Sequence, residues 1–231
     1  MNPRAIYVIP FYPDKDKTLL KNFDGLQESD IRFLQTTLYI NILENLEKKS
    51  EDTDIYCIVD ENTSIQSEED FKNFNYKFIY TDIKNKKELI DKLSTKEFLL
   101  YKKNLIVLSD AIDIRTSDYE QYFNLLNFEN NTLVIAKSKE DQIAVLGFNK
   151  FSNEIINSLM LSNFTYNDFL NRLKSCEYFM HIVNDVLLVR NVNNFKQLYS
   201  ELSQKKSMEY CSQKMHERFT HLFVEYKDLV K

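Results

Sequence analysis

A short loop with two lysines follows the first apolar run of the chain. The run over residues 5–10 ends at a proline, and Pro13, Lys15 and Lys17 come shortly after it. Two ammonium groups on a short loop fixed by proline can meet a diphosphate as point charges. The alternative is a solvated surface loop, which the spacing alone does not exclude. Lys15 and Lys17 are our candidate nucleotide-binding residues.

Acidic side chains follow two other apolar runs. Asp60 comes directly after residues 55–59, and Asp110 follows residues 105–108 after one serine. In an open parallel sheet, ligands bind beyond the carboxyl ends of the strands, and a carboxylate there can hold a Mg²⁺ or Mn²⁺ that bridges phosphate oxygens. The other interpretation is a carboxylate that caps a turn or a helix. Position alone is more typical of a cap for Asp60 and Asp113 and leaves both roles open for Asp110; we take Asp60 as a nucleotide-binding candidate and Asp110 as a metal candidate.

The residue pattern does not support several other kinds of chemistry. The chain contains only Gly25 and Gly147, and a Walker loop or a dinucleotide fingerprint needs several glycines so that backbone N–H groups can approach phosphate. No Gly-x-Ser-x-Gly elbow occurs. The three histidines and three cysteines are scattered, which is typical of structural or exposed side chains. The sequence assigns no catalytic residue.

Strand-like and helix-like segments alternate along the chain. The expected strands cover residues 5–10, 55–59, 76–80, 105–108, 132–137, 143–148 and 178–182, with 186–189 as a further extended run. The expected helices are a long one with Ser29 as N-cap, 67–73, 86–97, one from a Ser117–Glu120 capping box to about Leu126, 153–161 and 166–173. This rhythm predicts a three-layer α/β fold, with helices on both faces of a mainly parallel sheet. The two close strands after Thr132 predict a locally mixed sheet.

The last segment, residues 206–231, is separate in character from the α/β domain expected over residues 1–205. Its apolar residues fall at helical spacing over about six turns, at Met208, Cys211, Met215, Phe219, Leu222, Phe223, Tyr226 and Leu229. We expect one amphipathic C-terminal helix, which packs either on this domain or on a second subunit to form a homodimer.

Composition limits the class of protein. A chain of 231 residues that is 43% hydrophobic and 28% charged is ordinary for one globular domain. The net charge of -5 lacks the basic excess that is usual when nucleic acid is the main partner. No apolar run approaches the roughly 18 residues needed to cross a bilayer, and the first ten residues lack the layout of a secretory signal. We therefore expect a cytoplasmic protein without a transmembrane segment or a nucleic-acid partner.

Four stretches occur in an order that points to a known family. They are Pro13-Asp14-Lys15-Asp16-Lys17-Thr18-Leu19-Leu20, Ser109-Asp110-Ala111-Ile112, Glu140-Asp141-Gln142-Ile143-Ala144-Val145-Leu146-Gly147-Phe148 and Asn191-Val192-Asn193-Asn194. Through them the chain resembles, over residues 5–202, a small bacterial and archaeal family of glycosyltransferase-like proteins with the GT-A, or nucleotide-diphospho-sugar transferase, fold. That family includes glycosyltransferases implicated in arsenosugar synthesis, and cofactor guanylyltransferases are more distant relatives.

The chain departs from the family at several of these positions. The family loop Pro-Gly-x-x-Lys-Thr-Arg-Leu has Asp14 and Leu19 here in place of glycine and arginine, and the central strand motif Gly-x-Asp-x-Pro retains only Asp110. The family stretch Asp-Gly-Gly-Tyr-Tyr-Leu-Leu-Gly-Leu loses its paired glycines. Both acids of Asp-Val-Asp-Thr have become asparagine, at Asn191 and Asn193. An amide keeps an oxygen ligand but loses the charge, so it binds a hard dication less strongly.

The resemblance implies a role for individual residues and leaves the function open. It implies Lys15 and Lys17 near nucleotide phosphates, Asp110 near a metal or ribose, and Asn193 as a weaker metal ligand, with Mg²⁺ or Mn²⁺ as cofactor. One hypothesis is a glycosyl- or nucleotidyltransferase that acts on a nucleotide-diphospho substrate such as a nucleotide-sugar. Another is a catalytically degenerate member that serves as a binding or assembly module. An unrelated α/β enzyme for a small molecule is the third.

Overall fold

The chain folds around one mixed sheet. A computed structural model describes residues 3–10, 22–47, 51–60, 74, 76–83, 85–94, 101–173 and 177–230, and in these ranges the sheet has seven strands in the order β3-β2-β1-β4-β6-β5-β7. The strands are β1 (Arg4–Ile9), β2 (Thr53–Asp60), β3 (Lys77–Thr81), β4 (Lys103–Leu108), β5 (Thr132–Lys137), β6 (Ile143–Phe148) and β7 (Phe179–Ile182). Neighbouring strands are parallel except where β6 pairs with β4 and β5. The expected mainly parallel, locally mixed sheet is confirmed.

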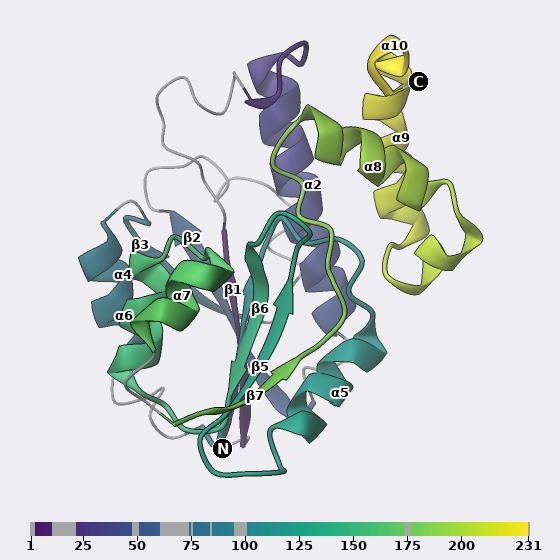
Figure 1. Cartoon of the computed structure of the whole chain (residues 1–231). Helices are drawn as coiled ribbons and strands as arrows, with labels where there is room; N and C mark the ends of the chain where they lie inside the picture. The colour runs from purple at the N-terminus through teal and green to yellow at the C-terminus, as the bar shows by residue number, and fades with distance from the viewer. Residues whose placement is uncertain are drawn as a thin grey trace.

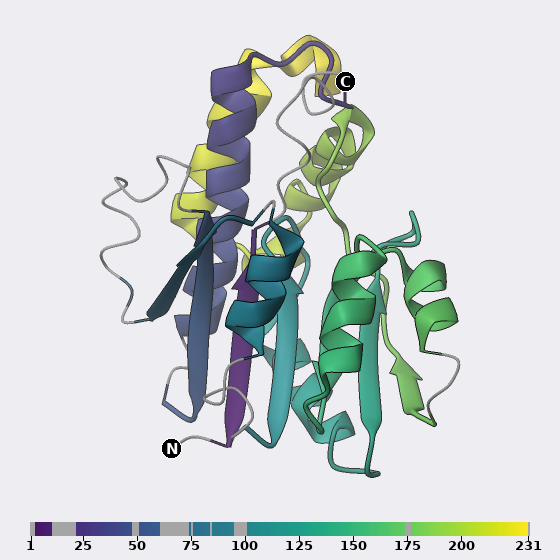
Figure 2. The ribbon, with the colours of Figure 1, turned by 90° about the vertical axis from the view of Figure 1, so that its left-hand side faces the viewer.

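Helices cover both faces of the sheet. One layer contains α4 (Lys86–Leu93), α6 (Asn153–Leu161) and α7 (Tyr166–Arg172), and the opposite layer contains α2 (Glu28–Glu47) and α5 (Thr116–Leu125), as Figures 1 and 2 show. The central strands are therefore shielded from water on both sides, and all six residues of β6 are buried. This double burial is why these strands appear in the sequence as continuous apolar runs rather than alternating patterns.

Gly147 in β6 lies where the sheet has no room for a side chain. A Cβ atom on this residue would lie 2.8 Å from Leu105 Cδ2 and 3.2 Å from Val134 Cβ. Those two residues are the cross-strand neighbours of Gly147 in β4 and β5. The glycine of the third sequence motif therefore serves close packing between three strands.

Two predicted helix starts are wrong in detail. Ser29 lies inside the first turn of α2, because backbone hydrogen bonds from Asp30 and Ile31 already end on the carbonyl of Gln27. Ser117 and Glu120 do not form the capping box of α5. Instead, Asp118 accepts a hydrogen bond of 2.7 Å from the backbone N–H of Arg115, and the Glu120 carboxylate binds Arg4 of β1 at 3.2 Å. Glu120, which the local pattern assigned to the capping box, instead forms a long-range ion pair with Arg4.

The C-terminal segment is not the single six-turn helix that its spacing predicted. After α8 (Val192–Leu202) the chain forms a short 3-10 helix, η3 (Lys205–Glu209), then α9 (Gln213–Glu225) and α10 (Lys227–Val230). The break has a local cause, since Ser212 caps α9 by accepting a hydrogen bond from the backbone N–H of Met215 at 3.2 Å.

The apolar side of α9 packs on its own domain. Figure 1 shows α9 alongside α2, and Met215, Phe219 and Leu222 are buried in the same core cluster as the sheet residues. The sequence left two alternatives open, packing on the same domain or on a second subunit. The first is present within a single chain. None of the helices in the described ranges combines the length and the apolar character that crossing a membrane requires.

Candidate functional site

The carboxyl ends of all the parallel strands meet at one edge of the sheet, the upper edge in Figure 1. The chain leaves β1 for β2 on one side, whereas β4 lies against β1 on the other side. The strand order therefore reverses between β1 and β4. In open α/β sheets, ligands bind at such a point, and we call this edge the rim.

A buried ion pair lies at the rim, where β4 ends. The Nε atom of Arg190 donates to Oδ2 of Asp110 at 2.5 Å, and the two side chains are only 9% and 5% exposed. The Nη1 atom of Arg190 donates to Oε1 of Gln142 at 2.8 Å. The other carboxylate oxygen of Asp110, Oδ1, is buried without a hydrogen-bond partner among the described residues. The sheet thus ends in a fixed charge pair.

Backbone hydrogen bonds hold the two partners together independently of their charges. The N–H of Val189 donates to the carbonyl of Asp110 at 3.0 Å, and the N–H of Ile112 donates to the carbonyl of Leu187 at 3.1 Å. Between these bonds, Ala111 and Leu188 form an isolated antiparallel bridge. The expected extended run over residues 186–189 therefore forms a short ladder with the segment after β4, which places Arg190 beside Asp110.

The start of α8 continues this network. Asn191 caps the helix by accepting from the backbone N–H of Asn194 at 2.9 Å, and Oδ1 of Asn194 accepts from the backbone N–H of Arg190 at 3.2 Å. The side-chain amide of Asn194 donates to Oε1 of Glu140 at 2.9 Å. The first turn of α8 thus fixes the backbone of Arg190 and also binds the loop after β5.

A polar cavity of about 380 Å³ opens between the loop after β5, the loop after β7 and α8. Hydroxyl, amide and carboxylate groups line it, among them Ser138, Glu140, Asp185, Asn194, Gln197 and Glu201. Groups of this kind can exchange hydrogen bonds with a polyhydroxylated ligand. The cavity is therefore suited to a sugar or a similar polar molecule next to the charge pair.

Asp113 belongs to the wall of this cavity, and its role is structural, as the sequence indicated. Its Oδ1 atom accepts a hydrogen bond of 2.8 Å from the backbone N–H of Leu187. Burial raises the pKa of Asp113 above its ordinary value, and the nearby Glu201 carboxylate raises it further. The backbone hydrogen bond opposes this shift because it favours the charged form.

The structure places only some of the predicted site residues. Lys15 and Lys17 lie outside the described residues. Asp60 ends β2 and is 2% exposed, and since β1 separates β2 from β4 the two strands are about 10 Å apart. Asn193 is exposed in the first turn of α8, whereas its neighbour Asn194 faces inward. The nucleotide-binding and metal roles of these residues stay predictions.

The described donor groups at the rim do not fit a divalent cation. No group of three or more His, Cys, Asp or Glu side chains that could hold a metal occurs among the described residues. One oxygen of Asp110 already binds the guanidinium of Arg190, and the side-chain oxygen of Asn191 caps α8. A Mg²⁺ at a nucleotide site is held by one or two carboxylates together with substrate phosphates and water, and Arg190 already engages the carboxylate at the end of β4.

Sequence reasoning missed Arg190, although a signal was present. Arg190 directly precedes Asn191 and Asn193, the two positions where the resembling family carries acids. An arginine followed by neutral amides gives this stretch a positive charge that is available to pair with a nearby acid. Gln142, its other partner, lies in the third motif at a position where the family carries glycine.

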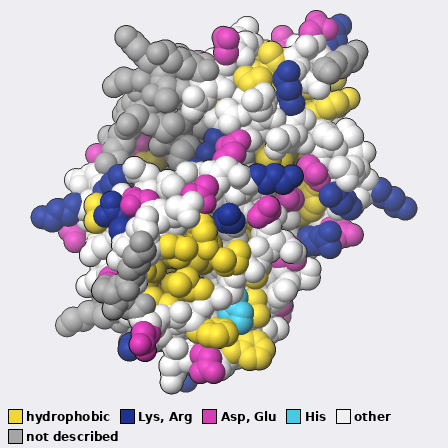
Figure 3. All heavy atoms as spheres, viewed as in Figure 1, with side chains coloured by type: hydrophobic (Ala, Val, Ile, Leu, Met, Phe, Trp, Pro, Cys, Tyr) yellow, Lys and Arg dark blue, Asp and Glu magenta, His cyan; other side chains and the backbone are white. Residues whose placement is uncertain are grey.

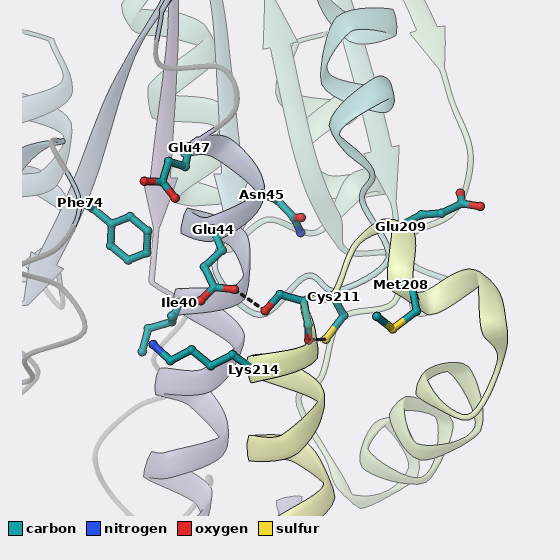
Figure 4. Close-up of a pocket in the computed structure, with 10 residues that line it drawn as sticks. Ile40, Glu44, Asn45, Glu47, Phe74, Met208, Glu209, Cys211 and Lys214 are labelled. Carbon is teal, nitrogen blue, oxygen red and sulfur yellow. Dashed lines mark hydrogen bonds between the residues drawn. The ribbon is translucent and has the colours of Figure 1, made fainter.

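A second cavity lies away from the rim, between α2 and the C-terminal segment (Figure 4). It has a volume of about 340 Å³, and Oγ of Ser212 donates to the Glu44 carboxylate at 2.6 Å beside it. Cys211 is the nucleophilic type of side chain here, but burial raises the pKa of its thiol to about 12. A thiol at that pKa is inert near neutral pH, so this cavity is not a candidate for covalent chemistry.

The chain has the fold seen in a proposed nucleotide-diphospho-sugar transferase and in a cytidylyltransferase. A proposed nucleotide-diphospho-sugar transferase from Desulfovibrio desulfuricans superposes with a TM-score of 0.74 at 16% identity, covering 100% of this chain and 97% of that one. A cytidylyltransferase from Leptospira borgpetersenii gives 0.53 at 10% identity over 98% and 95% of the two chains.

A third solved structure, a CMP:2-keto-3-deoxy-manno-octonic acid synthetase complexed with CTP, gives a TM-score of 0.52 at 9% identity, covering 87% of this chain and 99% of that one. No protein-family model matches the sequence, and no curated protein matches it. At these identities the likeness establishes the fold, which confirms the resemblance found in the sequence.

Proposed function

We propose that the chain transfers a glycosyl or nucleotidyl group and uses a nucleotide-diphospho substrate bound at the rim between β1 and β4. The observation that carries this proposal is the buried Asp110–Arg190 pair at the point where the strand order reverses. The likeness to a proposed nucleotide-diphospho-sugar transferase over the whole chain supports it, as does the CTP bound by a protein of the same fold.

The chemistry of such a transfer is mainly charge neutralisation and positioning. Negative charge develops on the departing phosphate, and preorganised cations or dipoles that face it lower the barrier. The chain has candidates in Lys15 and Lys17, which follow β1 in the sequence. The predicted Mg²⁺ or Mn²⁺ enters no step of the proposal, because the described donors do not fit a dication.

The polar cavity beside α8 supplies a place for the second substrate. It lies next to the charge pair, since Asn194 contributes both to its wall and to the hydrogen bond with the Arg190 backbone. An acceptor with several hydroxyl groups would find acceptors in Glu140 and Glu201 and donors in Asn194 and Gln197. We assign this cavity to the acceptor.

Ligand-induced stabilisation tests the proposal. A panel of CDP-, UDP- and GDP-linked sugars and CTP should contain at least one ligand that raises Tm by several degrees. A ligand at about 100 times its Kd adds about 2.7 kcal/mol to stability, and about 1 kcal/mol moves the Tm of a domain this size by about 2–4 °C.

Two variants assign the effect to the rim. Lys17→Ala should abolish the stabilisation, because it removes a candidate phosphate contact, whereas Lys92→Ala, a change at an exposed lysine on α4, should leave it intact. An unchanged Tm with every ligand, both with and without metal, would count against the transferase.

A binding or assembly module is the second candidate function, and one surface favours it. Hydrophobic side chains gather over β7, which is an edge strand of the sheet, around a histidine (Figure 3). Phe179 is 51% exposed, Ile182 is 55% exposed and the neighbouring Phe128 is 67% exposed. Exposed apolar groups on a sheet edge are typical of interaction sites. Binding of no nucleotide, together with self-association that Ile182→Lys abolishes, would favour the module.

The homodimer through the C-terminal helix stays a prediction. The described apolar side of α9 is already covered by α2 and α8 within the chain. Deletion of residues 206–231 followed by light scattering tests it, and a variant that remains folded with the same number of subunits as the full chain would contradict it.

A further inference from the structure

We propose that Arg190 takes over, inside the protein, the charge-neutralising role of a divalent metal at Asp110, so that the chain binds its nucleotide diphosphate without Mg²⁺ or Mn²⁺. This inference rests on the proposed function, and it adds how the rim balances its charge. The juxtaposition that carries it is the pair of buried side chains at the end of β4, with Nε of Arg190 at 2.5 Å from Oδ2 of Asp110.

A carboxylate next to a diphosphate site creates an electrostatic problem. Asp110 is 5% exposed at its side chain, and a bare negative charge in that position would repel the phosphates. A bridging dication is one solution, and an internal cation is another. Arg190 is a permanent cation, since its guanidinium is not deprotonated in proteins, so the rim is neutral at this point without any added ion.

The geometry leaves little room for both solutions at once. A dication bound by a carboxylate lies about 2.0–2.6 Å from its oxygens, which would bring it close to the guanidinium that already binds Oδ2 of Asp110. The like charges would repel each other in a poorly hydrated place. With Arg190 in place, only Oδ1 of Asp110, the oxygen without a described partner, is left for a metal, so binding through the whole carboxylate requires Arg190 to leave.

Arg190 is held firmly enough to make that departure unfavourable. Its Nη1 binds Gln142 at 2.8 Å, and its backbone N–H binds the side chain of Asn194. The ladder between residues 110–112 and 187–189 fixes the backbone on both sides of the pair. Gln142 is itself oriented, because its amide donates to Thr165 at 3.1 Å. The cation is therefore part of the fold.

The neighbouring polar residues do not restore a metal site. The oxygen of Asn191 caps α8, Asn193 is an exposed neutral amide, and Glu140 binds the amide of Asn194. Of these three described neighbours only Glu140 carries a negative charge, and its Oε1 atom is already engaged by Asn194, so they add little to the ligands that Asp110 could offer.

The experiment measures nucleotide affinity in EDTA and in Mn²⁺, using CTP, CDP and UDP as the probes in isothermal titration. The native chain should bind with the same Kd, within about twofold, under both conditions. Arg190→Gln should weaken binding in EDTA by at least about tenfold, because it exposes the phosphates to an unbalanced Asp110, and Mn²⁺ should restore it. The double variant Asp110→Asn with Arg190→Gln should again be independent of metal.

Matched controls separate this effect from damage to the fold. Arg172→Gln removes an exposed arginine that pairs with Asp168 on α7, and it should change neither affinity nor metal dependence. Arg190→Lys keeps the charge and should remain independent of metal. If Arg190→Gln does not fold, the native chain and Arg190→Lys still test the inference. A Kd that rises strongly in EDTA in either protein overturns it.

The failure of the inference and that of the proposed function are distinguishable. Binding of no nucleotide under any condition overturns the proposed function. Titration with Mn²⁺ alone then tests whether Arg190 prevents metal binding at Asp110. The native chain and Asp110→Asn should take up Mn²⁺ equally, while Arg190→Gln should gain a site that the double variant lacks. Mn²⁺ binding by the native chain that Asp110→Asn removes would overturn the inference.

Discussion

Two late segments of the chain return to its early half, and they attach in different ways. Residues 187–190 return to the end of β4 through a buried charge pair, Asp110 with Arg190. The C-terminal segment returns to α2 through buried apolar side chains and through hydrogen bonds without an ion pair, among them two in which the carbonyl of Tyr210 accepts from Asn41 at 3.1 Å and from Asn45 at 2.6 Å.

The difference between the two attachments indicates that the apolar one serves stability alone. Apolar residues of similar volume are often as stabilising as a buried ion pair, or more so, because taking charges out of water is costly. A structural attachment therefore has no need of a buried ion pair, and the buried part of the α2–α9 contact is apolar, with Arg218 of α9 lying over the Phe33 ring of α2. The charges at the rim, where the strand order reverses, indicate a role beyond stability.

The largest expected loss of stability comes from breaking the charged attachment. Arg190→Gln should lower the free energy of unfolding by about 3–5 kcal/mol, because it leaves the buried Asp110 carboxylate without a counter-charge. Urea denaturation measures this loss. The double variant Asp110→Asn with Arg190→Gln should recover most of it, and Arg172→Gln at an exposed pair should cost no more than about 0.5 kcal/mol. A single variant as stable as the native chain would show that the pair is not electrostatically coupled.

A comparable loss is expected at the apolar attachment, but without a binding effect. Phe219 is completely buried in α9 and stacks near Phe223, with ring centroids 6.5 Å apart. Phe219→Ala should cost about 3 kcal/mol through lost burial and the cavity left behind, again measured in urea. Val224→Ala on the exposed side of the same helix (67% exposed) should stay within about 0.5 kcal/mol. If nucleotide affinity fell in folded Phe219→Ala, the contrast between the two attachments would not hold.

The smallest expected effect is a pH-dependent change in stability at Asp113, beside the charged attachment. Because burial raises the pKa of Asp113 in the folded state, its ionisation at neutral pH opposes folding. Asp113→Asn keeps an oxygen for the Leu187 N–H and should be slightly more stable than the native chain at pH 7. The gain should shrink as the pH falls through the raised pKa of the folded state and should vanish below 3.8, the ordinary value, where Asp113 is protonated in both states. Tm measured across this range checks it, and a variant that is less stable at every pH would contradict the sign.

Much of the fold could be predicted because its strands are buried on both faces. The predicted ranges 132–137, 143–148 and 153–161 coincide with β5, β6 and α6. Helix boundaries were less predictable, since Glu120, expected in a capping box, binds Arg4 across 116 positions of the sequence. The long C-terminal stripe was found, but its division at Ser212 was not, because apolar spacing continues through the turn.

The sequence by itself determined the α/β class, the antiparallel pair after Thr132 and the acid at the end of the central strand, because these depend on local hydrophobic patterns. Only the tertiary structure decided what that acid does. Asp110 and Arg190 are 80 positions apart, and they meet because β7 runs parallel to β5 and returns the chain to the rim beside β4. A pairing of this kind depends on the order of the strands in the sheet, and no local pattern of residues contains that order.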